Sequence, residues 1–212
     1  MTPMPSFEFC AFRFLAQWEE SEYALYNAIR SIPTEKDIRK ALSYFQVARN
    51  FEGLKEAANA AFVVQSLLEV RADQALSSPH EKVNQLVKTL ETRFKQNNLS
   101  AASKLLWLSY RHPYIVYDNR AVIALRDEFG HRFEERDYSA YTKVWRELYV
   151  IFEASVQSAV EQLPKGRMFM RACPLSDQEL VRRAKETWFL ERVFDIFLWE
   201  IGGITNGGDT NE

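Results

Sequence analysis

Apolar residues recur every three or four positions along most of the chain, which is the spacing of one face of an α-helix. Ile38, Ala41, Leu42 and Phe45 follow this spacing in an early segment. The pattern predicts an all-α, multi-helix globular protein. The expected helices span residues 8–31, 34–48, 51–70, 79–96, 100–110, 119–129, 138–163 and 177–201.

Helix start and stop signals support these limits. Thr34 with Asp37, and Ser176 with Glu179, have the spacing of a capping box, in which the two side chains bond each other's backbone N–H groups. Glycine and polar residues dominate positions 202–212, which are expected to form a disordered tail. We therefore predict one helical domain over residues 1–201. Breaks between helices are expected at residues 32–33, 77–79, 132–137 and 164–166.

The composition suits a packed helical domain. Of the 212 residues, 47% are hydrophobic and 14% are aromatic, which is enough to build a core. Only seven glycines and seven prolines are present, so long helices with short connections are expected. The formal net charge of −2 argues against a protein that coats nucleic acid over its whole surface.

Residues 100–125 form the segment with the clearest chemical content. An apolar helix ends at His112-Pro113, because the residue before proline avoids the α region. A short extended run follows, and Asp118 then has the position of an N-cap at the start of a new helix. Such a carboxylate has two interpretations. It either only accepts backbone N–H bonds, worth about 1 kcal/mol, or it faces a cleft and stabilises a cationic transition state.

This segment resembles the lysine and aspartate region of helix-hairpin-helix base-excision DNA glycosylases, especially the archaeal-type 8-oxoguanine glycosylases. The matching residues are Ala102-Ser103 with Leu105 and Leu106, then Ile115-Val116-Tyr117, and then Asp118 with Arg120. The resemblance implies a glycosylase-like central part over about residues 79–130, nucleic-acid binding and base excision. In such a site Asp118 would stabilise an oxocarbenium-like sugar or activate a water molecule.

The segment departs from the family pattern in two places. Ser100 stands where the family has its catalytic lysine, and residues 96–99 contain no glycine where the family has a glycine-rich hairpin. Lys104 lies four residues further on, about one turn along the same helical face, and is the candidate to assist catalysis. Because only an amine forms a Schiff base, we expect any base excision to be monofunctional, without a covalent imine.

Positive charge gathers around this segment. Residues 75–126 contain eight Lys or Arg against three acids, which indicates either solvated helix faces or a phosphate-binding face. If this face binds phosphate, the residues expected to hold the phosphates are Lys95, Arg111 and Arg120. Tyr114 and Tyr117 are then candidates to stack on an extruded base.

The last predicted helix is apolar nearly all round in its final two turns. This pattern indicates either burial within the chain or a protein-partner surface, for which Trp188, Phe194 and Trp199 are the candidates. The second alternative gives a different function: a non-enzymatic helical interaction protein, or a homo-oligomer, such as a subunit of a bacterial defence or toxin assembly. Exposure of these three side chains would favour it.

Other chemistry has little sequence support. His131 lies near Asp127, Glu134 and Glu135, but Gly130 interrupts the helix that would gather them, so no metal site is predicted. The chain has no Walker loop, G-x-S-x-G or G-x-G-x-x-G motif, and we expect no cofactor. The two cysteines, at positions 10 and 173, do not form a CxxC pair, which suits a reduced cytoplasmic protein. No run of 18 apolar residues occurs, so no membrane span is expected.

Overall fold

The structure is a computed structural model that describes residues 4–166 and 175–207. Every regular element in this part of the chain is helical and none is a strand, which confirms the predicted all-α fold. The chain forms two compact units, and the single domain over residues 1–201 stays a prediction. We call Tyr23–Tyr117 the central unit, and Met1–Glu22 with Asp118–Glu212 the terminal unit, and describe each by itself.

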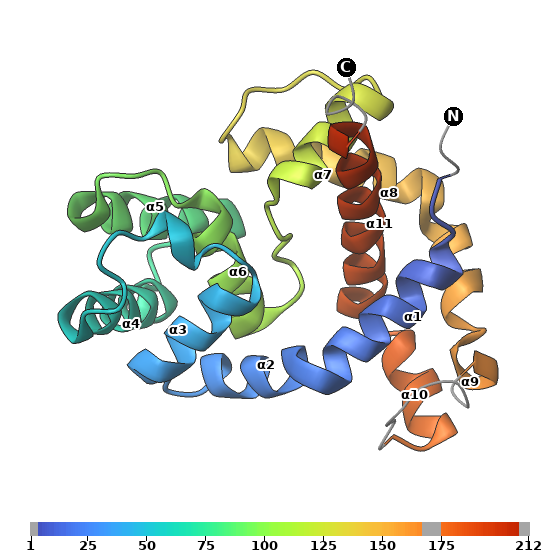
Figure 1. The fold of residues 1–212 in the computed structure, drawn as a ribbon, viewed down its shortest axis with the longest axis horizontal. Coiled ribbons are helices and arrows are strands. Elements are labelled where there is room, and N and C mark those ends of the chain that lie inside the picture. The colour runs from blue at the N-terminus through green and yellow to red at the C-terminus, as the bar shows by residue number, and fades with distance from the viewer. Residues whose placement is uncertain (1–3, 167–174, 208–212) are drawn as a thin grey trace. The chain divides into compact units, whose positions relative to one another are not determined.

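The central unit is built around one helix that is buried almost throughout. This helix, α6, has buried side chains at every position from Ala101 to Ser109 and packs on α2 and α5. In turn α3 packs on α4, and α4 packs on α5 (Figure 1). The elements are α2 (Tyr23–Arg30), α3 (Glu35–Tyr44), the 3₁₀ turn η2 (Ala48–Asn50), α4 (Ala57–Ala72), α5 (Pro79–Phe94) and α6 (Leu99–Tyr110).

Local caps explain where two of these helices begin. Thr34 and Asp37 form the predicted capping box at the start of α3. Ser78 and Glu81 form another at the start of α5, where Pro79 occupies the first turn and lacks an N–H that would need a partner. These contacts join residues three apart in sequence, so they form without help from the rest of the fold.

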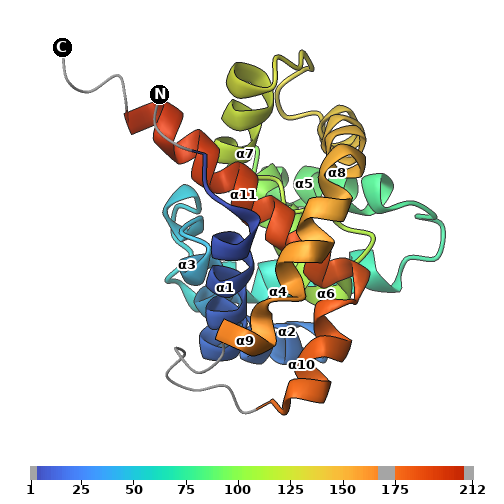
Figure 2. The same cartoon turned by 90° about the vertical axis from the view of Figure 1, so that its right-hand side faces the viewer.

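The terminal unit is organised around its last helix, α11, which packs on α1, α7 and α8 (Figure 2). Two π-helical turns, η1 and η3, directly follow α1 and α7. The elements are α1 (Phe7–Gln17), η1 (Trp18–Glu22), α7 (Asn119–Ile123), η3 (Ala124–Glu128), α8 (Tyr138–Val160), α9 (Leu163–Gly166), α10 (Asp177–Ala184) and α11 (Thr187–Gly207).

Aromatic side chains of α11 form the core of the terminal unit. Trp188 is 6% exposed, and its ring centroid lies 4.9 Å from that of Trp18 and 6.1 Å from that of Phe14. Phe194 is fully buried, 5.0 Å from the ring of Trp145. Burial within the chain is therefore confirmed for these two residues, whereas Trp199 is partly exposed. Trp188 and Phe194 are core residues and do not form an exposed partner surface.

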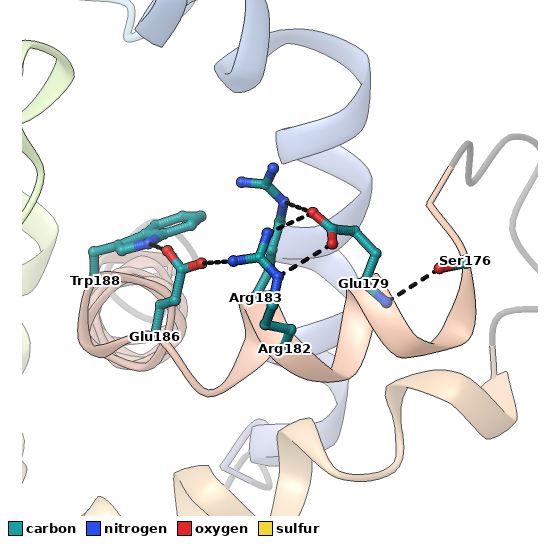
Figure 3. Close-up of polar contacts among 6 residues, drawn as sticks. All are labelled: Ser176, Glu179, Arg182, Arg183, Glu186 and Trp188. Carbon is teal, nitrogen blue, oxygen red and sulfur yellow. Dashed lines mark hydrogen bonds and ion pairs between the residues drawn. The ribbon is translucent and has the colours of Figure 1, made fainter.

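The predicted 177–201 helix differs from the observed one in two respects. It is broken after α10, at residues 185–186, and α11 continues to Gly207 although a disordered tail was predicted from Gly202. Only half of the predicted Ser176–Glu179 capping box forms, because Ser176 accepts the N–H of Glu179 at 3.2 Å (Figure 3) but the Glu179 carboxylate does not bond back to Ser176. The Glu179 carboxylate accepts bonds from Arg182 and Arg183. After this break α11 begins with the Glu186 carbonyl, which accepts the N–H of Leu190 at 3.3 Å, and the Glu186 carboxylate accepts the indole N–H of Trp188.

Candidate functional site

Asp118 begins α7 as the sequence predicts. Its backbone is extended, with φ −138° and ψ 139°, and its Oδ1 accepts the backbone N–H of Arg120 at 3.1 Å. Its own carbonyl accepts the N–H of Val122 at 3.0 Å, which is the first bond of the helix. The prediction of an N-cap carboxylate is therefore confirmed. A cap fixes the carboxylate relative to the helix but does not by itself give it a catalytic role.

Lys104 lies in the central unit on α6, and its side chain turns back one helical turn. Only 2% of the residue is exposed, and its Nζ donates to Ser100 Oγ at 2.7 Å. The ammonium also lies 5.7 Å from the ring centroid of Phe45. The amine of Lys104 is therefore next to the side chain that occupies the family's lysine position, as the helical spacing predicts. Asp118 belongs to the terminal unit.

The predicted nucleic-acid ligands of the central unit have different environments. Lys95 is exposed and ends α5 in the left-handed region, with φ 54°, and its Nζ donates to a carbonyl of the last turn at 2.8 Å. Arg111 is 6% exposed, with its guanidinium 3.5 Å from the ring centroid of Tyr26. Tyr114 and Tyr117 are buried. Burial raises the pKa of Tyr114 to about 12, so its hydroxyl stays protonated at neutral pH.

Three other cations of the 75–126 segment, Lys82, Arg93 and Arg126, are engaged within their own unit, and Lys88 is exposed. Lys82 donates to two carbonyls at the end of α4, and Arg93 donates to Asn59. Arg126 pairs with Glu135. These contacts give the positive charges structural partners, and phosphate binding by this segment stays a prediction.

Arg120, the remaining predicted ligand, lies in the terminal unit directly after the Asp118 turn. Its guanidinium is 4.0 Å from the ring centroid of Trp199 on α11, and both residues are partly exposed. Guanidinium groups stack favourably on indole rings because the ring face carries partial negative charge. This stack places a cation beside the N-terminal turn that Asp118 caps.

A buried acid on α11 was missed by the sequence analysis. Asp195 is 4% exposed, and its Oδ1 accepts the indole N–H of Trp145 at 2.9 Å. Burial raises the pKa of Asp195 to about 8, although the nearby Arg192 charge and the Trp145 hydrogen bond act in the opposite direction. The charges of Glu191 and Asp118 raise it further. Asp195 is therefore mostly neutral at pH 7.

A buried ion pair lies close by in the same unit. Arg192 Nη2 donates to Glu22 Oε1 at 2.8 Å, and their side chains are 10% and 0% exposed. The pair joins η1 to α11 across a sequence separation of 170 residues. The sequence holds one sign of this buried charge: Glu191, Arg192 and Asp195 lie inside an otherwise apolar helix. Charged residues are rarely buried unless they are paired, so these three predict buried partners.

Among residues 4–166 and 175–207, no group of three His, Cys, Asp or Glu is arranged to hold a metal ion, and no helix has the length and apolarity to cross a membrane. Cys10 is a buried free thiol whose pKa burial raises to about 12, whereas Cys173 lies outside the described residues. A groove of about 570 Å³ between the start of α3 and α4 includes Thr34, Arg39 and Val64 and contains no predicted site residue.

No family model, curated protein or solved structure is significantly similar to this chain. The likeness to DNA glycosylases therefore rests on residues 100–125 themselves.

Proposed function

We propose that this protein binds nucleic acid and excises a base as a monofunctional, DNA-glycosylase-like enzyme, with Asp118 as its catalytic carboxylate. The observation that carries the proposal is the position of Asp118, which follows an extended run and caps α7 with Arg120 beside it. This is the order of elements that the glycosylase resemblance requires. We propose a cytoplasmic role in DNA repair or antiviral defence.

In this reaction the bond between C1′ of the sugar and the base nitrogen breaks, and the base leaves with the bonding electrons. Positive charge develops on the sugar, and an ionised carboxylate stabilises it. Water then attacks C1′ and transfers one proton to Asp118, which passes it to the departed base anion, while the other proton stays on the new hydroxyl at C1′. Asp195 is mostly neutral at pH 7, so it adds little negative charge to the same unit while Asp118 does this work.

The amine of Lys104 is not needed as a nucleophile in this mechanism. It is buried and bonded to Ser100 Oγ, and Ser100 itself has no amine. A covalent imine is therefore not expected, because attack on C1′ requires an accessible amine. The supporting role of Lys104 is structural, since its hydrogen bond to Ser100 Oγ joins two successive turns of α6 within the glycosylase-like segment.

Nucleic-acid binding is tested first by measuring affinity for single- and double-stranded DNA and RNA at several salt concentrations. Affinity should fall as salt rises, because bound cations displace counterions from phosphates. Affinity that is absent, or independent of salt, would contradict this part of the proposal.

Excision is tested on duplexes that carry a panel of damaged and normal bases. Asp118→Asn should abolish base release while leaving nucleic-acid binding in place. The matched control is Asp137→Asn, because Asp137 caps α8 by accepting two backbone N–H groups at 2.8 and 3.0 Å. It removes the charge of a similar cap, while keeping an oxygen that accepts the N–H groups, without touching the proposed site. Equal loss of excision in both variants would show that the effect is not specific to Asp118.

The alternative, a non-enzymatic interaction protein, is favoured by one apolar feature. Val150 and Ile151 on α8 are 70% and 72% exposed, which is unusual for adjacent β-branched residues. We propose self-association through this face as the second candidate function. Light scattering after size exclusion should then show a dimer that Ile151→Glu converts to a monomer. A wild-type protein that is monomeric at all concentrations would exclude it.

A further inference from the structure

The Arg120 side chain is held flat against α11 by two residues that lie one helical turn apart. Trp199 stacks on the guanidinium at 4.0 Å. Four residues on, a Cβ added to Gly203 would lie 3.0 Å from Arg120 Nη1 and 3.4 Å from its Cζ. Residues four apart share one face of a helix. The missing side chain at Gly203 therefore leaves the space in which the guanidinium lies.

The backbone of Arg120 is fixed by the neighbouring glycine. A Cβ at Gly202 would lie 1.9 Å from the carbonyl oxygen of Arg120 and 2.6 Å from its carbonyl carbon. Only glycine at this position lets α11 approach the first turn of α7 so closely. The N–H of Arg120 is held at the same time by Asp118. Both the backbone and the side chain of Arg120 are thus set before any ligand binds.

The charge of Arg120 is not neutralised by an ion pair with any carboxylate among residues 4–166 and 175–207. Arg13, in the same unit, differs in this respect. Its guanidinium also lies over the ring of Trp199, 5.0 Å from the centroid, but it forms an ion pair with Glu200. A stacked guanidinium keeps its planar edge of N–H donors available, and that edge matches two oxygens of a phosphate. Arg120 is partly exposed, so the edge is within reach of solvent.

We infer that Arg120 is a preorganised phosphate-binding residue, with Trp199, Gly202 and Gly203 as its positioning residues. The inference rests on the proposed function only in taking the phosphate from a nucleic-acid backbone. A fixed side chain loses less conformational freedom on binding than a mobile one, so the cradle increases affinity without adding a contact.

The test compares three variants with wild type: Arg120→Gln, Gly203→Ala and the control Arg126→Gln. Arg126 lies in the same helical segment, but Glu135 already pairs with it. The probes are a short single-stranded oligonucleotide, titrated at several salt concentrations, and inorganic phosphate, followed by the Nε–Hε NMR signal of Arg120. Arg120→Gln should weaken oligonucleotide binding and reduce the salt slope by about 1. Arg126→Gln should change neither property.

Gly203→Ala separates positioning from stability. Alanine favours a helix more than glycine does, and the three atoms nearest to its Cβ all belong to the flexible Arg120 side chain, so the fold should be as stable as wild type or more so. Its oligonucleotide affinity should nevertheless fall several-fold. If Arg120→Gln fails to fold, Gly203→Ala decides the matter alone.

Wild-type affinity and salt slope in Gly203→Ala and in any folded Arg120→Gln would overturn the inference. Equal losses in Arg120→Gln and Arg126→Gln would also overturn it, because the effect would then be general charge. Oligonucleotide binding that is unchanged in Arg120→Gln, together with intact excision, removes the phosphate role and leaves the proposed function standing. Phosphate binding at Arg120 without excision of any base would support the phosphate role and contradict the proposed function.

Discussion

Replacing Asp195 with asparagine should make the protein more stable at alkaline pH and nearly unchanged at acid pH. Asparagine keeps an oxygen that accepts the Trp145 N–H, now 2.9 Å from Asp195 Oδ1, but it cannot ionise. The wild-type carboxyl has a pKa raised from 3.8 to about 8 by burial. Ionising it in the folded state therefore costs free energy that the unfolded chain does not pay.

The sign and size of the effect follow from linkage. Below pH 4 the carboxyl is protonated in both states, and it contributes no penalty. Between pH 4 and 8 the unfolded state is ionised and the folded state is not, so stability falls by about 1.4 kcal/mol per pH unit. The pKa of Asp195 is about 4 higher in the folded state than in the unfolded state. This difference lowers the free energy of unfolding by about 6 kcal/mol at most, and the whole effect is present above pH 8.

Urea unfolding of wild type and Asp195→Asn at pH 5, 7 and 9 measures this difference. The advantage of the variant should grow with pH and level off above pH 8. Asp177→Asn, on the exposed start of α10, is the control and should show no such trend. A variant that is less stable than wild type at pH 9 would refute the reasoning. It would mean that the Arg192 charge keeps Asp195 ionised in the fold.

Three further predictions concern the core and the chemistry. Glu22→Gln leaves Arg192 buried without its ion-pair carboxylate, and it should lower the free energy of unfolding by about 3 to 5 kcal/mol, measured with urea. Trp188→Ala should lower it by a similar amount, about 3 to 5 kcal/mol, equally at low and high protein concentration, because this side chain packs within its own chain. A dependence on concentration would indicate a partner contact instead. Borohydride treatment of the protein with damaged DNA should trap no adduct, and an adduct that disappears in Lys104→Ala would show that this lysine is the nucleophile.

Local signals in the sequence determined the helices and several of their ends. The Thr34 and Asp37 box and the Asp118 cap were predictable because each joins residues two or three apart. The position of Lys104 beside Ser100 followed from helical spacing alone. Energies of this kind depend on the nearest turn of the chain and on nothing beyond it.

Only the tertiary structure decided which charges are buried and which glycines matter. Glu22 meets Arg192 across 170 residues, and no local pattern pairs them. Gly202 looked like the start of a disordered tail, but α11 continues through it, and its missing Cβ admits the Arg120 carbonyl. Burial and close approach are properties of surfaces that meet after the helices have formed. A single sequence records the helices, but it does not record which of their faces will meet.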